Sequence, residues 1–265
     1  MALRRATRRR LGQGALYALL IAVVLLIALR VDWTKVHDNF WAPGLNGNWH
    51  DLIVTGVKNT LLYTLIAFAV GLVLALLLAL MKLSSNFAYR WIATAYIELF
   101  RGLPAMITML FMAFAVPIAF GWKPPGGTSG AGIVGLIMVA GAYMAETLRA
   151  GLQAVPKGQV EAAKSLGMNG LYTQVFIVIP QAFRIIIPPL TNEFVMLLKD
   201  TSLLSIVGAS IGERELTNVT RDFMTSGDTA GTGTSLAQAA VLYLIITLPL
   251  TQLVAWLERR QRRSR

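Results

Sequence analysis

Residues 52–81 read LIVTGVKNTLLYTLIAFAVGLVLALLLALM, and Lys58 is the only charged residue among them. About 17–25 apolar residues in a helix cross the roughly 30 Å hydrocarbon layer of a bilayer. The stretch therefore predicts a transmembrane helix that is long enough to tilt or to project beyond the bilayer. Small residues recur in it at every fourth position, at Ala67, Gly71, Ala75 and Ala79. Such a stripe lets another helix approach closely, and packing inside one subunit is favoured over a seam between two subunits.

The composition extends this prediction to most of the chain. Of 265 residues, 55% are hydrophobic and 14% are charged, and the mean hydropathy is +0.61. A soluble domain of this size could not hide so much apolar surface from water. Lipid is therefore expected to be the solvent for most of the protein.

Further apolar runs complete an all-α integral membrane fold with six predicted transmembrane helices. They occupy residues 15–29, 91–120, 131–148, a stretch from 175 to just before 199, and 236–257. Pro180 and Pro188-Pro189 are expected to interrupt the fifth span. Polar, turn-rich connections are expected at residues 33–48, 121–130 and 213–235.

The positive charge lies beside the membrane segments. The formal net charge is +11, and basic clusters stand at both ends: Arg4, Arg5, Arg8, Arg9 and Arg10, then Arg259, Arg260, Arg262, Arg263 and Arg265. Cations next to spans suit anionic headgroups and the positive-inside rule, whereas a nucleic-acid site would need a basic, water-exposed face. We therefore expect cytoplasmic termini, a lipid bilayer as partner and no nucleic acid. The first run lacks an A-x-A-like cleavage site, which predicts a retained helix rather than a signal peptide.

Several kinds of chemistry are disfavoured by the residue types present. The chain has no cysteine, and its two histidines are His37 and His50, so neither a disulfide framework nor a metal centre is expected. Residues 208–212 match the nucleophile-elbow pattern G-x-S-x-G, but they end an apolar segment and both histidines precede residue 52, which favours coincidence. The sequence contains no G-x-x-x-x-G-K-[ST] loop. We therefore expect no cofactor bound by this chain, and any ATP, with its Mg²⁺, on a separate polypeptide.

A long connection between the fourth and fifth spans, residues 151–180, reads GLQAVPKGQVEAAKSLGMNGLYTQVFIVIP. Residues 159–166 predict a short helix that carries Glu161 in its first turn and is capped by Gly167 in a left-handed conformation. Val160, Ala163 and Gly167 fall on one weakly apolar face, which predicts docking into a groove of another protein. The alternative is a helix lying on the membrane, but that helix would show bulky apolar anchors and several cations.

The same connection carries the residues by which the chain resembles a known family. Glu161-Ala162-Ala163, then Gly167, then Ile177-Val178-Ile179-Pro180 resemble the EAA loop of ATP-binding-cassette (ABC) importer permeases. Residues 96–104, YIELFRGLP, resemble the Y-I-E-x-F-R-G-T-P signature of the polar amino acid permeases, with Leu103 where threonine is usual. Further similar stretches are AYMAETLR at 142–149, VPKGQ at 155–159, PQA at 180–182 and LKDTSL at 198–203.

The resemblance covers about residues 52–258 and implies a type I ABC importer permease (MetI-like) core, preceded here by an extra N-terminal helix. It divides the chain into a basic N-terminus, first transmembrane helix and external loop at 1–51, the permease domain at 52–258, and a basic cytoplasmic tail at 259–265. In that family the loop at about 151–180 forms a coupling helix that docks on the ATPase. The coupling residues implied here are Gly158, Gln159, Glu161, Ala162, Ala163 and Gly167.

The resemblance also implies a cargo and an assembly. The expected cargo is a polar amino acid of the glutamate, glutamine or basic amino acid class. The expected partners are a dimer of ABC ATPase subunits, a second permease subunit (a paralogue or a second copy) and an external or periplasmic substrate-binding protein. The expected location is the bacterial plasma (inner) membrane. The chain would then be a transporter subunit without an ATPase site of its own, and not an enzyme.

Ionisable residues within the spans are costly in lipid and are therefore candidates for the substrate pathway. Glu98 and Arg101 lie three positions apart, as do Glu146 and Arg149. Each pair can line the pathway, or it can simply neutralise itself on one helix face.

The fifth span holds the other pathway candidates. Glu193 and Asn192 follow the break expected at Pro188-Pro189, and broken helices are tolerated in membranes beside water-filled cavities. Lys199, Asp200 and Thr201 are expected to form a gate or a turn, with interfacial anchoring as the alternative.

Two other classes of function stay open at this point. A secondary transporter or channel for a small polar solute would need no cytoplasmic docking loop, and many secondary transporters have broken helices repeated in two halves. An intramembrane enzyme would need catalytic groups clustered at membrane depth, and the sequence shows no such cluster. The docking loop favours the importer subunit.

Overall fold

The computed structural model describes residues 2–38, 48–227 and 229–263. Within these ranges every regular element is a helix. Five helices are long and apolar enough to cross a membrane, and the number rises to six if one sharply bent pair counts as a span. The all-α membrane fold predicted from the sequence is confirmed.

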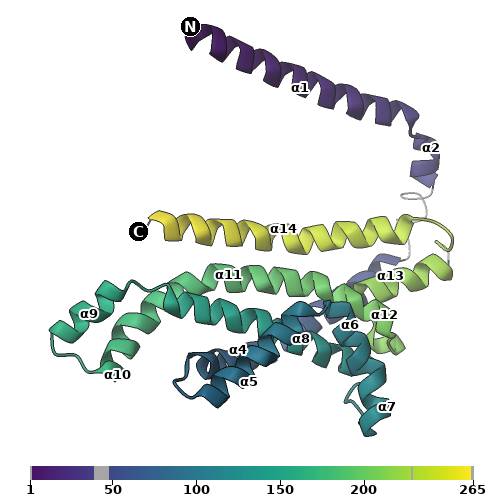
Figure 1. Ribbon diagram of the computed structural model, residues 1–265. Helices are drawn as coiled ribbons and strands as arrows, with labels where there is room; N and C mark the ends of the chain where they lie inside the picture. The colour runs from purple at the N-terminus through teal and green to yellow at the C-terminus, as the bar shows by residue number, and fades with distance from the viewer. Residues whose placement is uncertain (1, 39–47, 228, 264–265) are drawn as a thin grey trace.

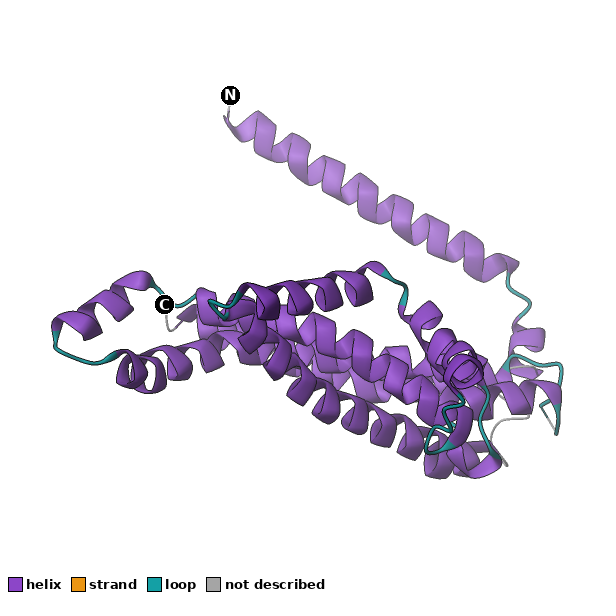
Figure 2. Cartoon of the chain, turned by 60° about the horizontal axis from the view of Figure 1, so that its bottom comes forward, coloured by secondary structure: helices purple, strands orange, loops and turns teal. Residues whose placement is uncertain are grey.

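The first helix stands apart from the rest of the chain (Figures 1 and 2). It is α1, Ala2–Arg30, and its candidate span Gln13–Arg30 is 0% buried. The short α2, Trp33–Val36, follows, and Asp32 caps it by accepting the backbone N–H of Lys35. α1 is the extra N-terminal helix predicted from the sequence, whereas residues 39–47 of the expected external loop lie outside the described residues.

The second span is one continuous helical rod. It consists of α3, Asn48–Asp51, the π-helical turn η3, Leu52–Val57, and α4, Lys58–Leu83. α4 packs along α8, Gly127–Gln153, which begins inside the glycine-rich stretch expected to be a loop. Thr128 and Ser129 in the first turn of α8 both donate to the carbonyl of Gly208, at 3.2 Å each.

Glycines allow α4 and α8 to approach closely. A Cβ atom on Gly71 would lie 2.9 Å from the Cε atom of Met144, and one on Gly141 would lie 2.8 Å from the Cδ2 atom of Leu74. The remaining small residues of the α4 stripe, Ala67, Ala75 and Ala79, are fully buried. The stripe therefore packs within the subunit, as predicted.

The third span is broken in the middle. α5, Phe87–Gly102, is followed after two residues by α6, Ala105–Leu110, the π-helical turn η4, Phe111–Ala115, and α7, Val116–Phe120. The two halves meet at 105°. Pro104 has no N–H to continue α5 and disfavours helical dihedrals at the residue before it, so Leu103 is extended. The single span expected at residues 91–120 is thus two helices joined at a sharp bend.

The fifth span, by contrast, is not interrupted by its prolines. α9, Lys157–Ser165, leads through α10, Gly170–Thr173, and the π-helical turn η5, Gln174–Val178, into α11, Ile179–Asp200. Pro188 and Pro189 lie inside α11, so the break expected there was wrong. Membrane helices tolerate proline where neighbouring helices hold them, and α11 packs against α8 and α14.

The last connection contains a helix that the sequence pattern did not indicate. After α11 come η6, Thr201–Leu203, α12, Leu204–Val207, η7, Ile211–Glu213, α13, Leu216–Thr225, and the final span α14, Thr234–Arg263. α12 and α13 lie at one end of the bundle, and α9 and α10 lie at the other (Figure 1). The long spans thus separate two sets of short helices, one set at each end of the bundle.

Candidate functional site

A cavity lies where the broken span bends. Its volume is about 190 Å³, and Leu103, Pro104 and Ala105 of the break form part of its lining. Two long spans supply most of the other lining residues: Leu136, Val139, Ala140, Tyr143 and Met144 from α8, and Glu193, Met196, Leu197 and Asp200 from α11. A solute in this cavity would touch both helices and the peptide groups of the bend.

Two carboxylates give the cavity its chemistry. Glu193 and Asp200 are seven positions apart on α11, so they lie on one helix face, about two turns apart. The lining contains no lysine or arginine among the described residues, although Arg101 acts on Glu193 and Lys199 acts on Asp200 through their charges. Carboxylates at this depth are costly in lipid, which makes them candidates for contact with a polar solute.

The other candidates expected in the fifth span, on α11 and at the start of η6, do not line the cavity. Asn192 is exposed, and its amide lies 3.5 Å from the sulfur of Met196. Lys199 is exposed as well. Thr201 is fully buried and donates its hydroxyl hydrogen to the carbonyl of Leu198 at 2.6 Å. The structure thus brings Glu193 and Asp200 together and places the other three elsewhere.

Arg101 contacts an aromatic ring instead of the glutamate one turn before it. Its guanidinium carbon lies 5.4 Å from the centre of the Tyr143 ring, and the two residues also meet through the Arg101 carbonyl, 3.5 Å from the Tyr143 hydroxyl. No ion pair joins Glu98 to Arg101 in the described part of the chain. Of the two alternatives given for this pair, neutralisation on one helix face is wrong. Neither residue belongs to the cavity lining, although Arg101 lies beside Tyr143 of the cavity wall.

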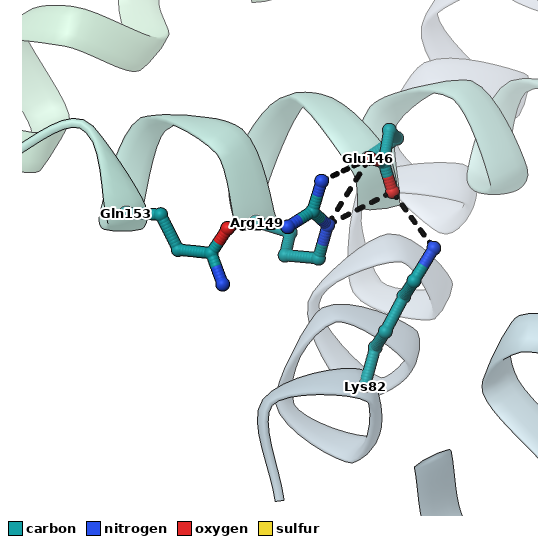
Figure 3. Close-up of polar contacts among 4 residues, drawn as sticks. All are labelled: Lys82, Glu146, Arg149 and Gln153. Carbon is teal, nitrogen blue, oxygen red and sulfur yellow. Dashed lines mark hydrogen bonds and ion pairs between the residues drawn. The ribbon is translucent and has the colours of Figure 1, made fainter. Parts of the chain in front are cut away.

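Glu146 lies outside the cavity lining. It pairs with Arg149 on its own helix, as expected, and with Lys82 from α4 (Figure 3). The sequence analysis did not identify Lys82, because nothing in the spacing of residues 82 and 146 shows that the ends of α4 and α8 lie side by side.

The end of the bundle near α13 is held by polar residues at the start of α4. Asn59 donates to the carbonyls of Gly212 and Arg214, at 3.0 and 2.9 Å. Tyr63 donates to the carbonyl of Glu213 at 2.7 Å. These contacts tie the segment after α12 to α4. Asn59 and Tyr63 could have indicated this contact from the sequence, because polar residues four positions apart near the start of an apolar span need hydrogen-bond partners when they are buried.

The opposite end of the bundle carries α9. Gly158, Gln159, Glu161 and Ala162 are exposed on it. Gly167 ends the helix with φ of +82°, the left-handed cap expected from the sequence. Ala163 is buried, however, and Val160 packs on a core that contains Val155, Val178 and residues of α11. These two members of the face expected to dock on a partner therefore face their own chain, whereas Gly167 is exposed. The outward face of α9 is the one that holds Glu161.

The geometry defines a class of protein. Several membrane spans line a mostly apolar cavity that holds two carboxylates. A short exposed helix lies between the two spans that form most of its walls, which is the arrangement of the membrane-spanning subunit of a transporter. The family described as "binding-protein-dependent transport system inner membrane component" matches residues 71–263. The chain belongs to this family, which confirms the resemblance to importer permeases.

Several relatives match nearly their whole length. The probable glutamine ABC transporter permease GlnM of Bacillus subtilis is 34% identical over 80% of this chain and 94% of its own. The glutamine transport system permease GlnP of Escherichia coli is 33% identical over 88% and 99%. The L-cystine transport system permease TcyB of Bacillus subtilis is 30% identical over 89% and 94%.

A solved structure shares the fold. The crystal structure of an amino acid ABC transporter with histidines is 35% identical to this chain, covers 79% of it and 93% of its own chain, and superposes with a TM-score of 0.70. The inward-facing MetNI methionine ABC transporter, at 19% identity and a TM-score of 0.64, supports the fold alone.

Proposed function

We propose that this chain is the permease subunit of an ATP-driven importer of polar amino acids. The names of its relatives, which refer to glutamine and cystine transport, support the substrate class. The two carboxylates of the cavity support a cargo that carries an ammonium group, because each can accept hydrogen bonds from it. The cavity would be the part of the pathway that this subunit contributes.

One observation carries the coupling half of the proposal. α9 connects α8 to the α10–η5–α11 rod, and both α8 and α11 line the cavity. A partner that binds the exposed face of α9 is therefore connected through it to both helices that line the cavity. We assign that partner as an ATPase dimer, with Gly158, Gln159, Glu161 and Ala162 at the contact and with Ala163 and Gly167 shaping the helix.

The rest of the assembly follows from the same proposal. A second permease subunit, identical or paralogous, would complete the pathway. An external binding protein would deliver the amino acid at the α13 end, and both termini would lie in the cytoplasm with α9. ATP and Mg²⁺ would bind to the partner ATPase and not to this chain.

Transport into proteoliposomes tests the function. The assembled transporter, with ATPase and binding protein, would be offered labelled L-glutamine, L-glutamate, L-cystine, L-arginine, L-lysine and L-histidine with and without internal ATP. We expect ATP-dependent and binding-protein-dependent uptake of at least one of them. Uptake that an ion gradient drives without any ATPase would instead establish a secondary transporter and reject the proposal.

A further inference from the structure

Four polar side chains form a cluster between the ends of α4 and α8 (Figure 3). Lys82 Nζ donates to Glu146 Oε2 at 3.1 Å. Arg149 Nε lies 3.1 and 3.0 Å from the two carboxylate oxygens of Glu146, and the far end of the same guanidinium bonds to Glu146 and Gln153. Glu146 thus ties the last turns of α8 together and fastens them to α4.

The cluster lies between the cavity and α9 along a single helix. Tyr143 and Met144, immediately before Glu146, belong to the cavity wall. Gln153 is the last residue of α8, and α9 begins four positions later, at Lys157. Any displacement of α9 must pass through this stretch of α8 to reach the cavity from that side.

The packing of α4 against α8 does not rest on the cluster alone. The contact of α4 with α8 is already built by the glycine crossing and by fully buried residues such as Ala75 and Met144. The side chains of Lys82 and Glu146 are 18% and 23% exposed to solvent. Because the pair is partly buried and Arg149 holds the same carboxylate, the cluster can also contribute to folding stability. A role in transport must therefore be separated from that contribution by measurement.

Without the cluster, the last turns of α8 would bend more easily than the rest of the helix. Gly151 lies in them, and glycine gives the backbone more freedom than any other residue. A larger residue would not fit at position 151, because a Cβ atom there would lie 2.1 Å from Cγ1 of Ile186 in α11. Force applied at α9 could therefore bend this segment against α11 and leave the cavity wall in place.

We propose that Glu146 is a positioning residue for transport. Its ion pair with Lys82 makes the end of α8 move as one body with α4, so that a displacement of α9 reaches Tyr143 and Met144. This inference rests on the proposed function, since it requires a partner that moves α9. It assigns to Glu146 a role in coupling instead of contact with the solute.

The test is the number of amino acid molecules imported per ATP hydrolysed by the full transporter in proteoliposomes. Labelled L-glutamine, L-arginine and L-cystine serve as probes, and the one that the unaltered protein imports fastest is used. In Glu146→Gln and Lys82→Gln we expect hydrolysis to continue and the import-to-hydrolysis ratio to fall by roughly threefold to tenfold. Lys82→Arg, which keeps the cation, should restore most of the ratio.

A double variant shows whether the two residues act through each other. Lys82→Gln combined with Glu146→Gln should lower the ratio no further than either change alone, because both remove the same contact. Arg90→Gln, which removes an exposed cation from α5 near the same end, is the matched control and should leave the ratio unchanged.

The outcomes separate this inference from the proposed function. If the unaltered protein shows no ATP-dependent import, the proposed function fails. If it imports normally and Lys82→Gln and Glu146→Gln keep its import-to-hydrolysis ratio, Glu146 has no positioning role. Equal loss of import and hydrolysis with a lowered Tm would show a structural role only and would also overturn the inference. Should Glu146→Gln fail to fold, the comparison of Lys82→Gln with Lys82→Arg decides alone.

Discussion

The hydroxyl of Tyr243 in α14 donates a hydrogen bond to Oε2 of Glu215, 3.3 Å away, at the foot of α13. Glu215 is fully buried, and its carboxylate also caps α13 by accepting the backbone N–H groups of Thr217 and Asn218, at 2.7 Å each. Burial raises the pKa of Glu215 from its usual 4.5 to about 7, although these hydrogen bonds oppose the shift. The carboxyl group thus joins α13 to the last span at a point that titrates near neutrality.

The stability of the chain should therefore depend on pH through Glu215. The folded chain holds this proton more tightly than an unfolded one, so the contribution is complete below pH 4.5 and is lost as the pH rises to about 7. The loss is on the order of 2–3 kcal/mol in the free energy of unfolding. Glu215→Gln should remove it. Tm values of both proteins, measured by tryptophan fluorescence from about pH 5 to about pH 8, provide the check, and parallel curves would contradict the prediction.

The glycines of α8 should differ in their tolerance of a methyl group. A Cβ atom on Gly135 would lie 2.8 Å from the Cα atom of Met109, whose backbone cannot move away easily. The same atom on Gly141 would lie 2.8 and 3.1 Å from Cδ2 and Cγ of the Leu74 side chain, which can move, and 3.5 Å from the carbonyl oxygen of Gly71, an ordinary contact distance. Gly135→Ala should cost about 1–3 kcal/mol. Gly141→Ala should cost less, because the Leu74 side chain can move aside, so that the gain of about 1 kcal/mol in helix propensity, which both variants share, offsets most of the strain. Thermal unfolding of the two purified variants tests this, and equal Tm values would refute it.

The outward face of α9 should decide the contact with the ATPase. Glu161→Ala removes a charge from that face, and Gly167→Asp places a side chain where φ is +82°, which costs about 1–2 kcal/mol in the cap. Both variants should insert in the membrane normally but lose co-purification with the ATPase and ATP-dependent uptake. Arg90→Gln is the control. Full retention of the ATPase by both variants would exclude α9 as the docking helix.

The carboxylates of the cavity should favour cationic cargo. Asp200→Asn removes one negative charge from the lining, and a hydrogen bond to a charged group is worth about 1.5–3 kcal/mol. The uptake of labelled L-arginine relative to labelled L-glutamine should therefore fall by roughly tenfold or more. Asn192→Asp, on the exposed side of the same helix, is the control. An unchanged ratio in Asp200→Asn would show that the cargo does not contact Asp200.

Local sequence patterns predicted the spans well because apolar length and small-residue spacing depend on one segment at a time. Ala67 and Gly71 indicated a tight crossing, and Gly167 indicated a left-handed cap, since each effect is local. Which face of α9 is buried, by contrast, depends on contacts with distant residues. Val160 and Ala163 fit a docking face by their spacing, but Val160 packs on a core that includes residues of α11, and Ala163 is buried.

The misses share this cause. Pro188 and Pro189 were expected to break α11, yet packing against neighbouring spans holds the helix through them. Leu216–Thr225 was expected to lie in a polar connection, because its helix is capped by a buried glutamate from outside the usual set of capping residues. Lys82 was not identified because its partner lies 64 positions away. In each case a distant contact outweighs the local preference.

The bend at Leu103 and Pro104 places backbone at the wall of the cavity. Its position depends on a proline and on a helix end, and not on which side chain stands beside it. The carbonyl of a peptide group is an acceptor whatever residue carries it, and every residue except proline also supplies an N–H donor. This boundary of the cavity should therefore change little with most substitutions at Leu103. On the proposed function, Tyr143, Glu193 and Asp200 are then the lining positions where a single substitution most changes the charge and hydrogen-bonding groups offered to the cargo.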